Sequence, residues 1–589
     1  MRKKGEFIRK IFSYLERDRN VYVLFAVFSA TLMLIAIYKH SVPTGWDLSF
    51  HYNRFYEAAM QIKHNNYSYF ATLYGFNSTG RMINVLYGPI FAYLNGLLVL
   101  LTGTWFRYYI FSSWLLYFLS SSILYVTFKK LEVKRSYAIL LSLFFAVSYP
   151  LVSWMTNQGF RTWGIIFMPL CLLPALQYLK TGRFNKWSLG ISVGFMAQVH
   201  LLSTLFLILI YLFIFSVAWF KSSHKWRDVQ ELIKAIVIFL ALTPNLWLSF
   251  SHLYRYNQII PVYVNGTFLT DTINRYAKVH LAPRSTFILM VLHLVMMMIW
   301  AFQKRSRRVL YIGLIYMIFI YLSTSWFPWE WFVGKGYSLV ELVQFPHRFF
   351  DYAIILLLIS LGLFFTYATS SVNLRATILV LLGFSVLYGV GHVYLGSIRR
   401  YHSFMTRDYF IKVNVSREEF QKAVNSSDLS QFINLTEAYM ADYLPKYGDT
   451  DELADSYTFK HYYNMYRAHV INNPQSFQVS VGKQKVIYRW KTNKEKEVIL
   501  PAVLYHNSDL TVNGKSFSIS TNNVTEIGMP KLISRQGQNT AVLTYRNPSW
   551  LIPSLVMTFL MWCFAIYKLF QSSLGSTYSK GLRMLGKTS

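Results

Sequence analysis

The clearest candidate for chemistry is a short polar run that places an acid, an imidazole and a guanidinium about one helical turn apart. In the segment 43–57, helical spacing puts Asp47, His51 and Arg54 on one face, with apolar side chains on the neighbouring face. We therefore expect an amphipathic helix on the membrane surface, beginning near Asp47. A carboxylate there lies at the positive end of the helix dipole and can accept a proton. The alternative is a helix-capping Asp with solvated neighbours.

A second polar cluster stands at the expected outer start of a membrane helix. It runs from Gln344 through Pro346 to His347 and Arg348. Proline suits the first turn of a helix. His347 and Arg348 would then present positive charge where a phosphate could dock on free backbone N–H groups. The alternative is interfacial anchoring, in which Arg348 extends its guanidinium to lipid headgroups.

Isolated ionisable residues elsewhere add to these clusters. Arg161 lies in a short polar segment expected outside the membrane. The apolar run 187–220 is too long for one crossing, so we expect two short helices broken near His200. Broken helices often line a cavity, although a lone histidine there is more often structural. The sequence contains no Walker loop, dinucleotide fingerprint, HExxH motif or nucleophile elbow.

Composition predicts that membrane helices position these residues. Of the 589 residues, 54% are hydrophobic and only 14% are charged, whereas about a quarter are charged in a soluble domain. Many apolar runs reach the roughly 18–20 residues that cross a bilayer. These features exclude a disordered chain and argue strongly against a soluble enzyme. They predict a polytopic α-helical membrane protein.

Charge and cysteine usage narrow the class further. The net charge of +32 does not indicate nucleic-acid binding, because Lys and Arg gather in short segments between apolar runs, where they set orientation. Cys171 and Cys563 both fall in predicted membrane helices, so no disulfide framework or cysteine-ligated zinc site is available. The composition, rich in Lys, Asn, Tyr and Ile, indicates a Gram-positive bacterium.

The basic segments predict about twelve crossings of the plasma membrane with both termini in the cytoplasm. Residues 1–397 would form the transmembrane module, with a first outer loop at 40–104 and one continuous helix at about 230–250 among its spans. Residues 398–547 would form an extracellular domain, and 548–589 a last transmembrane helix with a basic cytoplasmic tail. Tyr87–Leu101 would break the alternation if it crossed, so we expect it to lie at or dip into the outer surface.

The expected outer domain changes character along its length. Its first half reads as helical, for example at Arg417–Phe420, and its second half alternates like strands. The Asn513-Gly514 pair is the signal of a tight hairpin, and Ala541–Tyr545 reads as a further strand. We predict an α+β domain that contains a small β-sandwich.

Several short motifs resemble a family of bacterial polytopic proteins labelled 6-pyruvoyl-tetrahydropterin-synthase-related, which is akin to the YfhO-like membrane proteins. The similarity covers nearly the whole chain. The segments that carry it are Gly45–Asp47 with His51 and Arg54, Tyr87–Tyr93, Gln344–Phe349, Asp442–Lys446 and Val512–Lys515.

These proteins in turn resemble the GT-C class of glycosyltransferases. The resemblance implies an inverting membrane enzyme that moves a sugar from a polyprenyl-phosphate donor to a cell-wall or surface glycopolymer. The class carries its catalytic acid in the first outer loop, which maps onto Asp47. Cations would stabilise the leaving phosphate. The implied substrate-binding residues are His51, Arg54, Glu57, Arg161, Gln344, His347 and Arg348.

Two departures and two alternatives accompany this resemblance. Asp47 has no adjacent acid, since Glu57 is ten residues on, which weakens any claim for a divalent metal. His347 stands where the family often has Trp. A lipid-linked sugar transporter would more naturally show mid-membrane charges and repeated halves. A non-catalytic protein of cell-envelope polysaccharide assembly is the other alternative.

Overall fold

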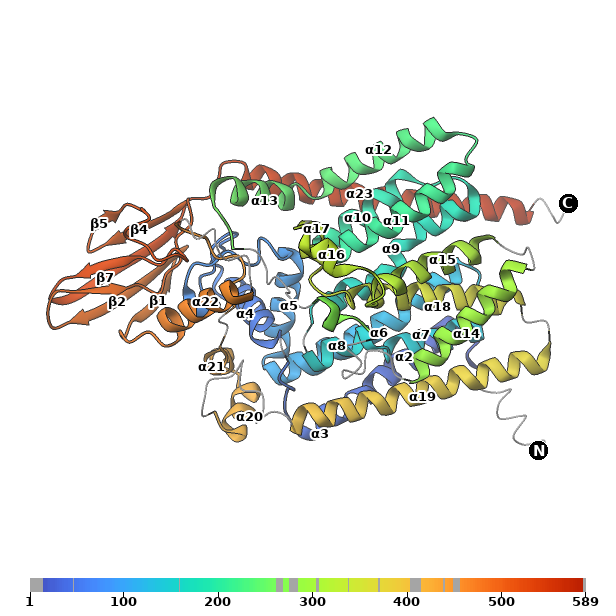
Figure 1. Ribbon diagram of the computed structural model, residues 1–589, viewed down its shortest axis with the longest axis horizontal. Helices are drawn as coiled ribbons and strands as arrows, with labels where there is room; N and C mark the ends of the chain where they lie inside the picture. The colour runs from blue at the N-terminus through green and yellow to red at the C-terminus, as the bar shows by residue number, and fades with distance from the viewer. Residues whose placement is uncertain are drawn as a thin grey trace.

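A computed structural model shows an elongated molecule with a helical body and a small sheet domain at one end (Figure 1). The structure describes the following residues: 14–45, 47–157, 159–260, 268–274, 284–302, 307–336, 338–368, 371–402, 415–437, 440–448 and 456–585.

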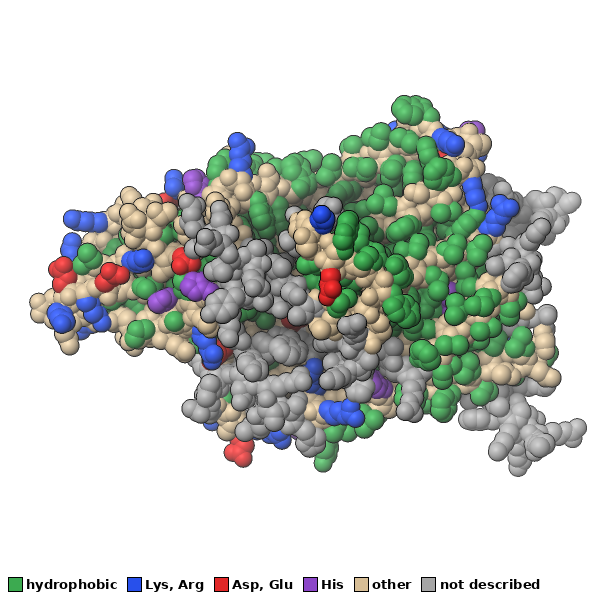
Figure 2. All heavy atoms as spheres, viewed as in Figure 1, with side chains coloured by type: hydrophobic (Ala, Val, Ile, Leu, Met, Phe, Trp, Pro, Cys, Tyr) green, Lys and Arg blue, Asp and Glu red, His purple; other side chains and the backbone are tan. Residues whose placement is uncertain are grey.

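Eight helical segments among the described residues are long and apolar enough to cross a membrane. They are α2 (Asp18–Leu32) with α3 (Leu34–Lys39), α6 (Trp105–Lys130), α7 (Arg135–Ala146) with α8 (Tyr149–Asn157), α9 (Arg161–Thr181), α11 (Leu201–Lys221), α18 (Arg348–Ala368), α19 (Val372–His402) and α23 (Leu551–Leu585). The other helices of the body are α10 (Lys186–Val199), α12 (Lys225–Leu242), α13 (Pro244–Tyr256), α14 (Arg284–Phe302), α15 (Arg307–Leu322), α16 (Trp329–Gly334) and α17 (Ser338–Val343). In Figure 2, hydrophobic side chains cover much of the visible face of this body.

Within the described ranges the candidate spans number eight, or nine if a bent pair counts as one, so the expected twelve are not confirmed. Part of the difference is length, since α10 has 14 residues and α15 has 16. The expected break near His200 is confirmed, because α10 ends at Val199 and α11 begins at Leu201. The expected single helix over 230–250 is wrong, since α12 and α13 meet at a bend of 73°.

The helix α5 (Pro89–Thr102) is too short to cross a bilayer. Its 14 residues extend about 21 Å, against a hydrocarbon core of about 30 Å. It packs against α4 (Leu48–His64), and both lie between the helical body and the sheet domain (Figure 1). This position agrees with a helix at one edge of the membrane.

The sheet domain follows three short helices, α20 (Arg417–Asn425), α21 (Leu429–Leu435) and α22 (Ser456–Tyr466). An antiparallel five-stranded sheet has the order β1-β2-β7-β4-β5, and β3 pairs with β6 in a second sheet. The strands are β1 (Gln478–Gly482), β2 (Lys485–Thr492), β3 (Lys496–Ile499), β4 (Ser508–Val512), β5 (Lys515–Phe517), β6 (Lys531–Ser534) and β7 (Gly537–Tyr545). Side chains from both sheets share one apolar core, as expected of a small sandwich.

The turn of the β4–β5 hairpin is predictable from its two residues. Asn513 and Gly514 have φ of 47° and 80°, and a two-residue turn of this kind requires positive φ at both positions. Asn and Gly tolerate that conformation best. The predicted hairpin and the predicted strand at Ala541–Tyr545 are both confirmed.

The sheet domain is built directly onto the first polar loop of the chain. Phe70 and Met82 of that loop share a buried core with Val503 and Tyr505. The N–H of Val503 donates to the carbonyl of Thr79 over 2.7 Å. The two polar segments therefore fold as one unit, which covers the end of the helical body where the candidate site lies.

Candidate active site

The helix α4 does not have the solvated polar face that its sequence suggests. His51, Arg54 and Glu57 are all buried, as are most apolar residues on the neighbouring face. Tertiary packing buries the helix, because α5 packs against it, the loop after α4 bonds to Glu57, and Phe160, just before α9, stacks on His51. The expectation of an amphipathic surface helix is therefore wrong, although the helix begins at Leu48, next to the expected start near Asp47.

Asp47 lies at the start of α4 but does not cap it. Its side chain makes no capping hydrogen bond, and the part of the chain that the structure describes shows no other hydrogen bond or close ion pair to its carboxylate. A Cβ atom on Gly159 would lie 3.9 Å from Oδ2 of Asp47, so the small residue leaves room beside the acid. The capping alternative thus does not explain why an acid stands here.

The surroundings of Asp47 shift the pKa of its carboxyl group. Burial raises the pKa of Asp47 to about 6, and the guanidinium groups of Arg161 and Arg348 partly oppose this rise. The carboxylate is therefore ionised at neutral pH and titrates close to it. Neither arginine comes within 4 Å of Asp47 as an ion pair, so both act on it through space.

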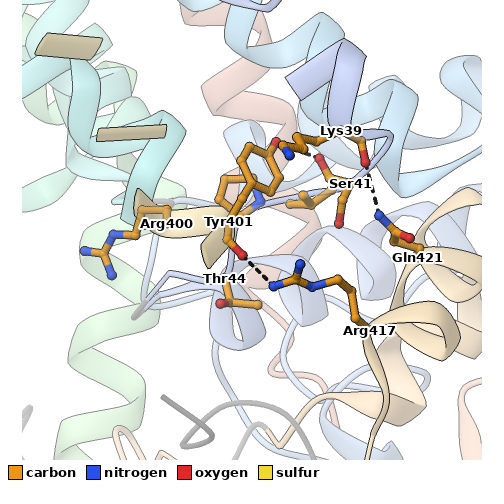
Figure 3. A pocket seen from close by; sticks show the side chains of 9 residues that line it. Lys39, Ser41, Thr44, Arg400, Tyr401, Arg417 and Gln421 are labelled. Carbon is orange, nitrogen blue, oxygen red and sulfur yellow. Dashed lines mark hydrogen bonds between the residues drawn. The ribbon is translucent and has the colours of Figure 1, made fainter. Parts of the chain in front are cut away.

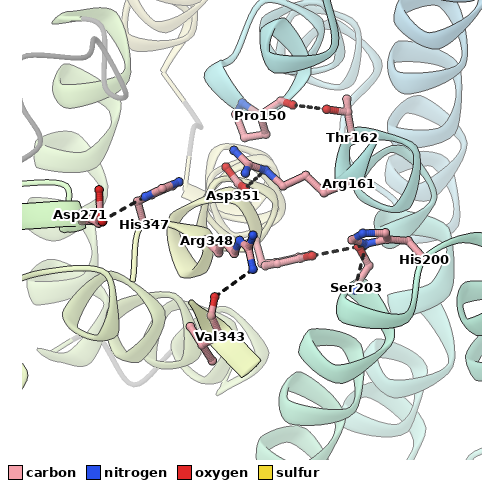
Figure 4. Close-up of polar contacts among 11 residues, drawn as sticks. Pro150, Arg161, Thr162, His200, Ser203, Asp271, Val343, His347, Arg348 and Asp351 are labelled. Atoms are coloured by element: carbon pink, nitrogen blue, oxygen red, sulfur yellow. Dashed lines mark hydrogen bonds and ion pairs between the residues drawn. The ribbon is translucent and has the colours of Figure 1, made fainter. Parts of the chain in front are cut away.

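Arg161 and Arg348 come from the starts of two different helices, α9 and α18. Nε of Arg161 lies 2.9 Å from Oδ2 of Asp351, whose side chain is fully buried one turn into α18 (Figure 4). Arg348 donates through Nη1 to the carbonyl of Val343 over 3.0 Å. Nε of Arg348 is buried without a hydrogen-bond partner in the described chain. A donor of this kind is suited to an incoming anion.

The start of α18 differs from the expected phosphate dock in two ways. His347 is buried, and its ring and backbone N–H both contact the carbonyl of Asp271 at 3.1 Å. Burial and the nearby arginines hold its pKa well below the ordinary value, so His347 carries no positive charge at neutral pH. The N–H groups of residues 347–350 all donate to backbone carbonyls. Any anion here would rely on arginine side chains rather than on a free helix end.

His200 sits at the α10–α11 break and joins a short polar chain. Its Nδ1 lies 2.9 Å from Oγ of Ser203 (Figure 4). The same Oγ lies 2.9 Å from the hydroxyl of Tyr352. Burial lowers the pKa of His200 to about 3, with contributions from Arg348 and Arg54. The histidine is therefore neutral, and its bonds tie the break to α18.

His51 and Arg54 form an aromatic-walled layer beside the charged residues. Arg54 is fully buried and donates to His51, to Asn84 and to the carbonyl of Tyr87 over 3.1, 3.0 and 2.9 Å. Its guanidinium also lies 4.5 Å from the ring centre of Tyr87 and 4.9 Å from that of Phe160. These contacts tie Arg54 to the first loop, and the predicted roles of His51 and Arg54 in substrate binding stay predictions.

The carboxylate of Glu57 is also occupied by hydrogen bonds within the protein. Its carboxylate accepts hydrogen bonds from the backbone N–H groups of Leu73, Tyr74 and Gly75 and from the side chain of Gln61, over 2.6–2.8 Å. This arrangement anchors the loop after α4. Gln344 has a positive φ of 61° at the turn before α18. The substrate roles of Glu57 and Gln344 stay predictions.

The segment that leads to Asp47 is held by α19 and α20 (Figure 3). Tyr401 donates to the carbonyl of Ser41 over 2.8 Å, and Gln421 donates to that of Lys39 over 3.1 Å. The small pocket between them has a volume of about 30 Å³, room for roughly one water. The two hydrogen bonds fix the backbone of the segment that leads to Asp47.

The described residues hold no group of three His, Cys, Asp or Glu side chains that could bind a metal ion. The residue that sequence reasoning passed over is Asp351. It follows Arg348 by three positions, so it shares a helix face with that arginine. An acid one turn inside an apolar span is a functional signal in its own right.

The chain matches no protein-family model and no curated protein. A solved structure of the arabinofuranosyltransferase AftD from Mycobacteria aligns with 63% of this chain at 15% identity and a TM-score of 0.40. The alignment spans 28% of that chain, well under a third of its length. A likeness of this degree does not establish a shared fold or a shared activity.

The fold and the site together define a class. The protein is a multi-pass membrane protein with a small sheet domain and a partly buried carboxylate–arginine cluster at the end of its spans. The resemblance to the YfhO-like proteins rests on the short motifs alone.

Proposed function

We propose that the protein is a GT-C-type glycosyltransferase that moves a sugar from a polyprenyl-phosphate donor to a cell-envelope glycan. The observation that carries the proposal is Asp47, an uncapped carboxylate whose pKa burial raises to about 6 and on which two arginines of separate helices act electrostatically. If Asp47 served only a structural ion pair, its carboxylate would contact one of these arginines directly. Here Arg161 pairs with Asp351 instead, and Asp47 stays open.

The proposed reaction uses each of these groups once. A hydroxyl of the acceptor attacks the anomeric carbon of the donor, and Asp47 takes the hydroxyl proton. The bond from that carbon to the phosphate oxygen breaks, and the lipid phosphate leaves with the electron pair. Arg348 and Arg161 stabilise the growing negative charge on the phosphate. Attack opposite to the leaving group inverts the sugar.

The proposed orientation places the site outside the cytoplasm. The start of α2 and the end of α23 lie at the same end of the molecule, opposite to the sheet domain (Figure 1). We propose that this end is cytoplasmic and that the domain within 398–547 is extracellular, where it would guide the acceptor glycan. The lipid tail of the donor would lie against the apolar helices.

The direct test is sugar transfer by the purified protein in lipid, with polyprenyl-phosphate sugars as donors and cell-wall glycan as acceptor. Transfer that depends on the lipid phosphate would support the proposal. Absence of transfer with every common donor would favour the assembly-protein alternative. Uptake of intact lipid-linked sugar across a vesicle membrane without transfer would favour a transporter.

Arg348→Ala is expected to raise the donor KM about 10–100-fold, because a phosphate loses a charge-assisted hydrogen bond worth about 1.5–3 kcal/mol. Arg348→Lys should recover part of this loss, since the charge returns without the planar guanidinium. Steady-state kinetics with varied donor measures both. An unchanged donor KM in Arg348→Ala would remove this residue from the phosphate site.

The pH dependence of transfer is expected to follow Asp47. Because only the ionised carboxylate accepts a proton, kcat/KM should rise with pH through about 6 and then level off. The profile of kcat/KM reports the free enzyme, which is the state described here. A rise centred near the ordinary aspartate value of about 4 would contradict the environment assigned to Asp47.

A further inference from the structure

A basic cleft lies at the end of the molecule away from the sheet domain. It forms where α6 and α9 end and where α10 begins, and its volume is about 620 Å³. Four cationic side chains and one acid line it, together with two aromatic rings. They are Lys130, Lys180, Arg183, Lys186, Glu231, Phe184 and Trp187.

The charges of the cleft are only partly neutralised within the protein. Lys180 pairs with Glu132 at 2.9 Å, and Lys186 lies 3.5 Å from Glu231. In the described chain, Lys130 and the guanidinium of Arg183 have no carboxylate partner within 4 Å. Two cations of separate segments thus line one cavity, with no carboxylate of the described residues within 4 Å.

The position of the cleft favours a lipid over a soluble anion. Lys130 and Thr181 are the last residues of two apolar spans, so the cleft opens at the membrane edge. Phe184 and Trp187 add an apolar wall, and Trp187 packs edge-on against Phe564 of α23 at 5.4 Å. Tryptophan is favoured at the headgroup level because its ring is amphipathic. Basic pockets at the ends of membrane helices suit phosphate headgroups.

We propose that this cleft binds the phosphate headgroup of an anionic phospholipid, with Lys130 and Arg183 as the principal contacts. The site is separate from the Asp47 cluster and does not depend on any transferase activity. The shared chemistry is a phosphate ester, which a lipid or a soluble phosphate could supply. The geometry at the membrane edge assigns it to the lipid.

The test is native mass spectrometry of the full-length protein titrated with phosphatidylglycerol, phosphatidylcholine and inorganic phosphate. Wild type is expected to bind phosphatidylglycerol in preference to phosphatidylcholine. Each cation near a membrane surface contributes about 1 kcal/mol, so each removal should lower affinity about fivefold. The double variant Lys130→Gln with Arg183→Gln should therefore lose about 25-fold in affinity for phosphatidylglycerol.

The matched control removes the same charge on the same side of the molecule but outside the cleft. Lys221→Gln with Lys225→Gln changes the end of α11 and the start of α12, and it should keep wild-type affinity. Equal losses in both double variants would show unspecific charge attraction and overturn the site. Phosphatidylcholine bound as tightly as phosphatidylglycerol would also overturn it. Inorganic phosphate bound in the cleft without any lipid preference would overturn the lipid assignment.

Discussion

Asp47→Asn is expected to lower sugar transfer by about 10²–10⁴-fold, the range typical of general acid–base catalysis, while the protein stays folded. Asparagine has nearly the same shape but cannot accept the hydroxyl proton. The fold should tolerate the change, because the carboxylate neither caps α4 nor bonds to any described residue. Transfer assays with purified variants in lipid measure the loss.

Stability gives this variant a second, independent readout. Because burial raises the pKa of Asp47 from 3.8 to about 6, the folded state holds the proton more tightly than the unfolded state. The resulting stabilisation is complete below about pH 3.8 and is lost as the pH rises through 6. At pH 7.5 the wild type carries an ionised acid that costs about 1–3 kcal/mol. Asp47→Asn should therefore raise the melting temperature at pH 7.5.

The matched control for Asp47→Asn is Asp428→Asn. Asp428 also precedes a helix, α21, but its Oδ1 accepts from the N–H of Ser430 over 3.0 Å, as an ordinary cap does. This control should keep full transfer and gain no stability. Near-normal turnover in Asp47→Asn would remove Asp47 from the mechanism, and a fall in melting temperature would show that the acid is structural.

Asp351→Ala is expected to destabilise the protein by about 3–5 kcal/mol, because it leaves the guanidinium of Arg161 without its buried partner. An exposed pair provides the comparison. Arg546 and Asp509 lie 2.8 Å apart, but their side chains are 71% and 46% exposed. Asp509→Ala should therefore cost no more than about 1 kcal/mol. Thermal unfolding in the same lipid compares the two.

A double variant separates the contribution of the Arg161–Asp351 pair to stability from the proposed role of Arg161 in catalysis. Arg161→Met with Asp351→Leu replaces both charges by apolar groups of similar size, which often restores stability. We expect the melting temperature to recover while transfer stays at least tenfold below wild type, because the leaving phosphate loses a cation. Recovery of transfer together with stability would show that Arg161 serves the fold alone.

Much of the architecture follows from local pattern. The length of the run 187–220 required a break, and the structure places it at His200. The Asn513-Gly514 pair marked a hairpin, because few residues accept positive φ twice in succession. Apolar composition predicted membrane helices, since each span must satisfy its own backbone in lipid. The bend between α12 and α13 was missed, because a proline after Thr243 also suits a continuous kinked helix.

The sequence by itself determined the membrane class, the α4 helix that starts after Asp47, and two arginines at helix starts. Only the tertiary structure decided which charges meet. Helical spacing placed His51 and Arg54 beside Asp47, yet both are buried and bonded to each other. Arg161 instead found Asp351 on another helix. Spacing reports neighbours along one helix, whereas burial and ion pairing depend on helices far apart in the chain, whose packing no local pattern records.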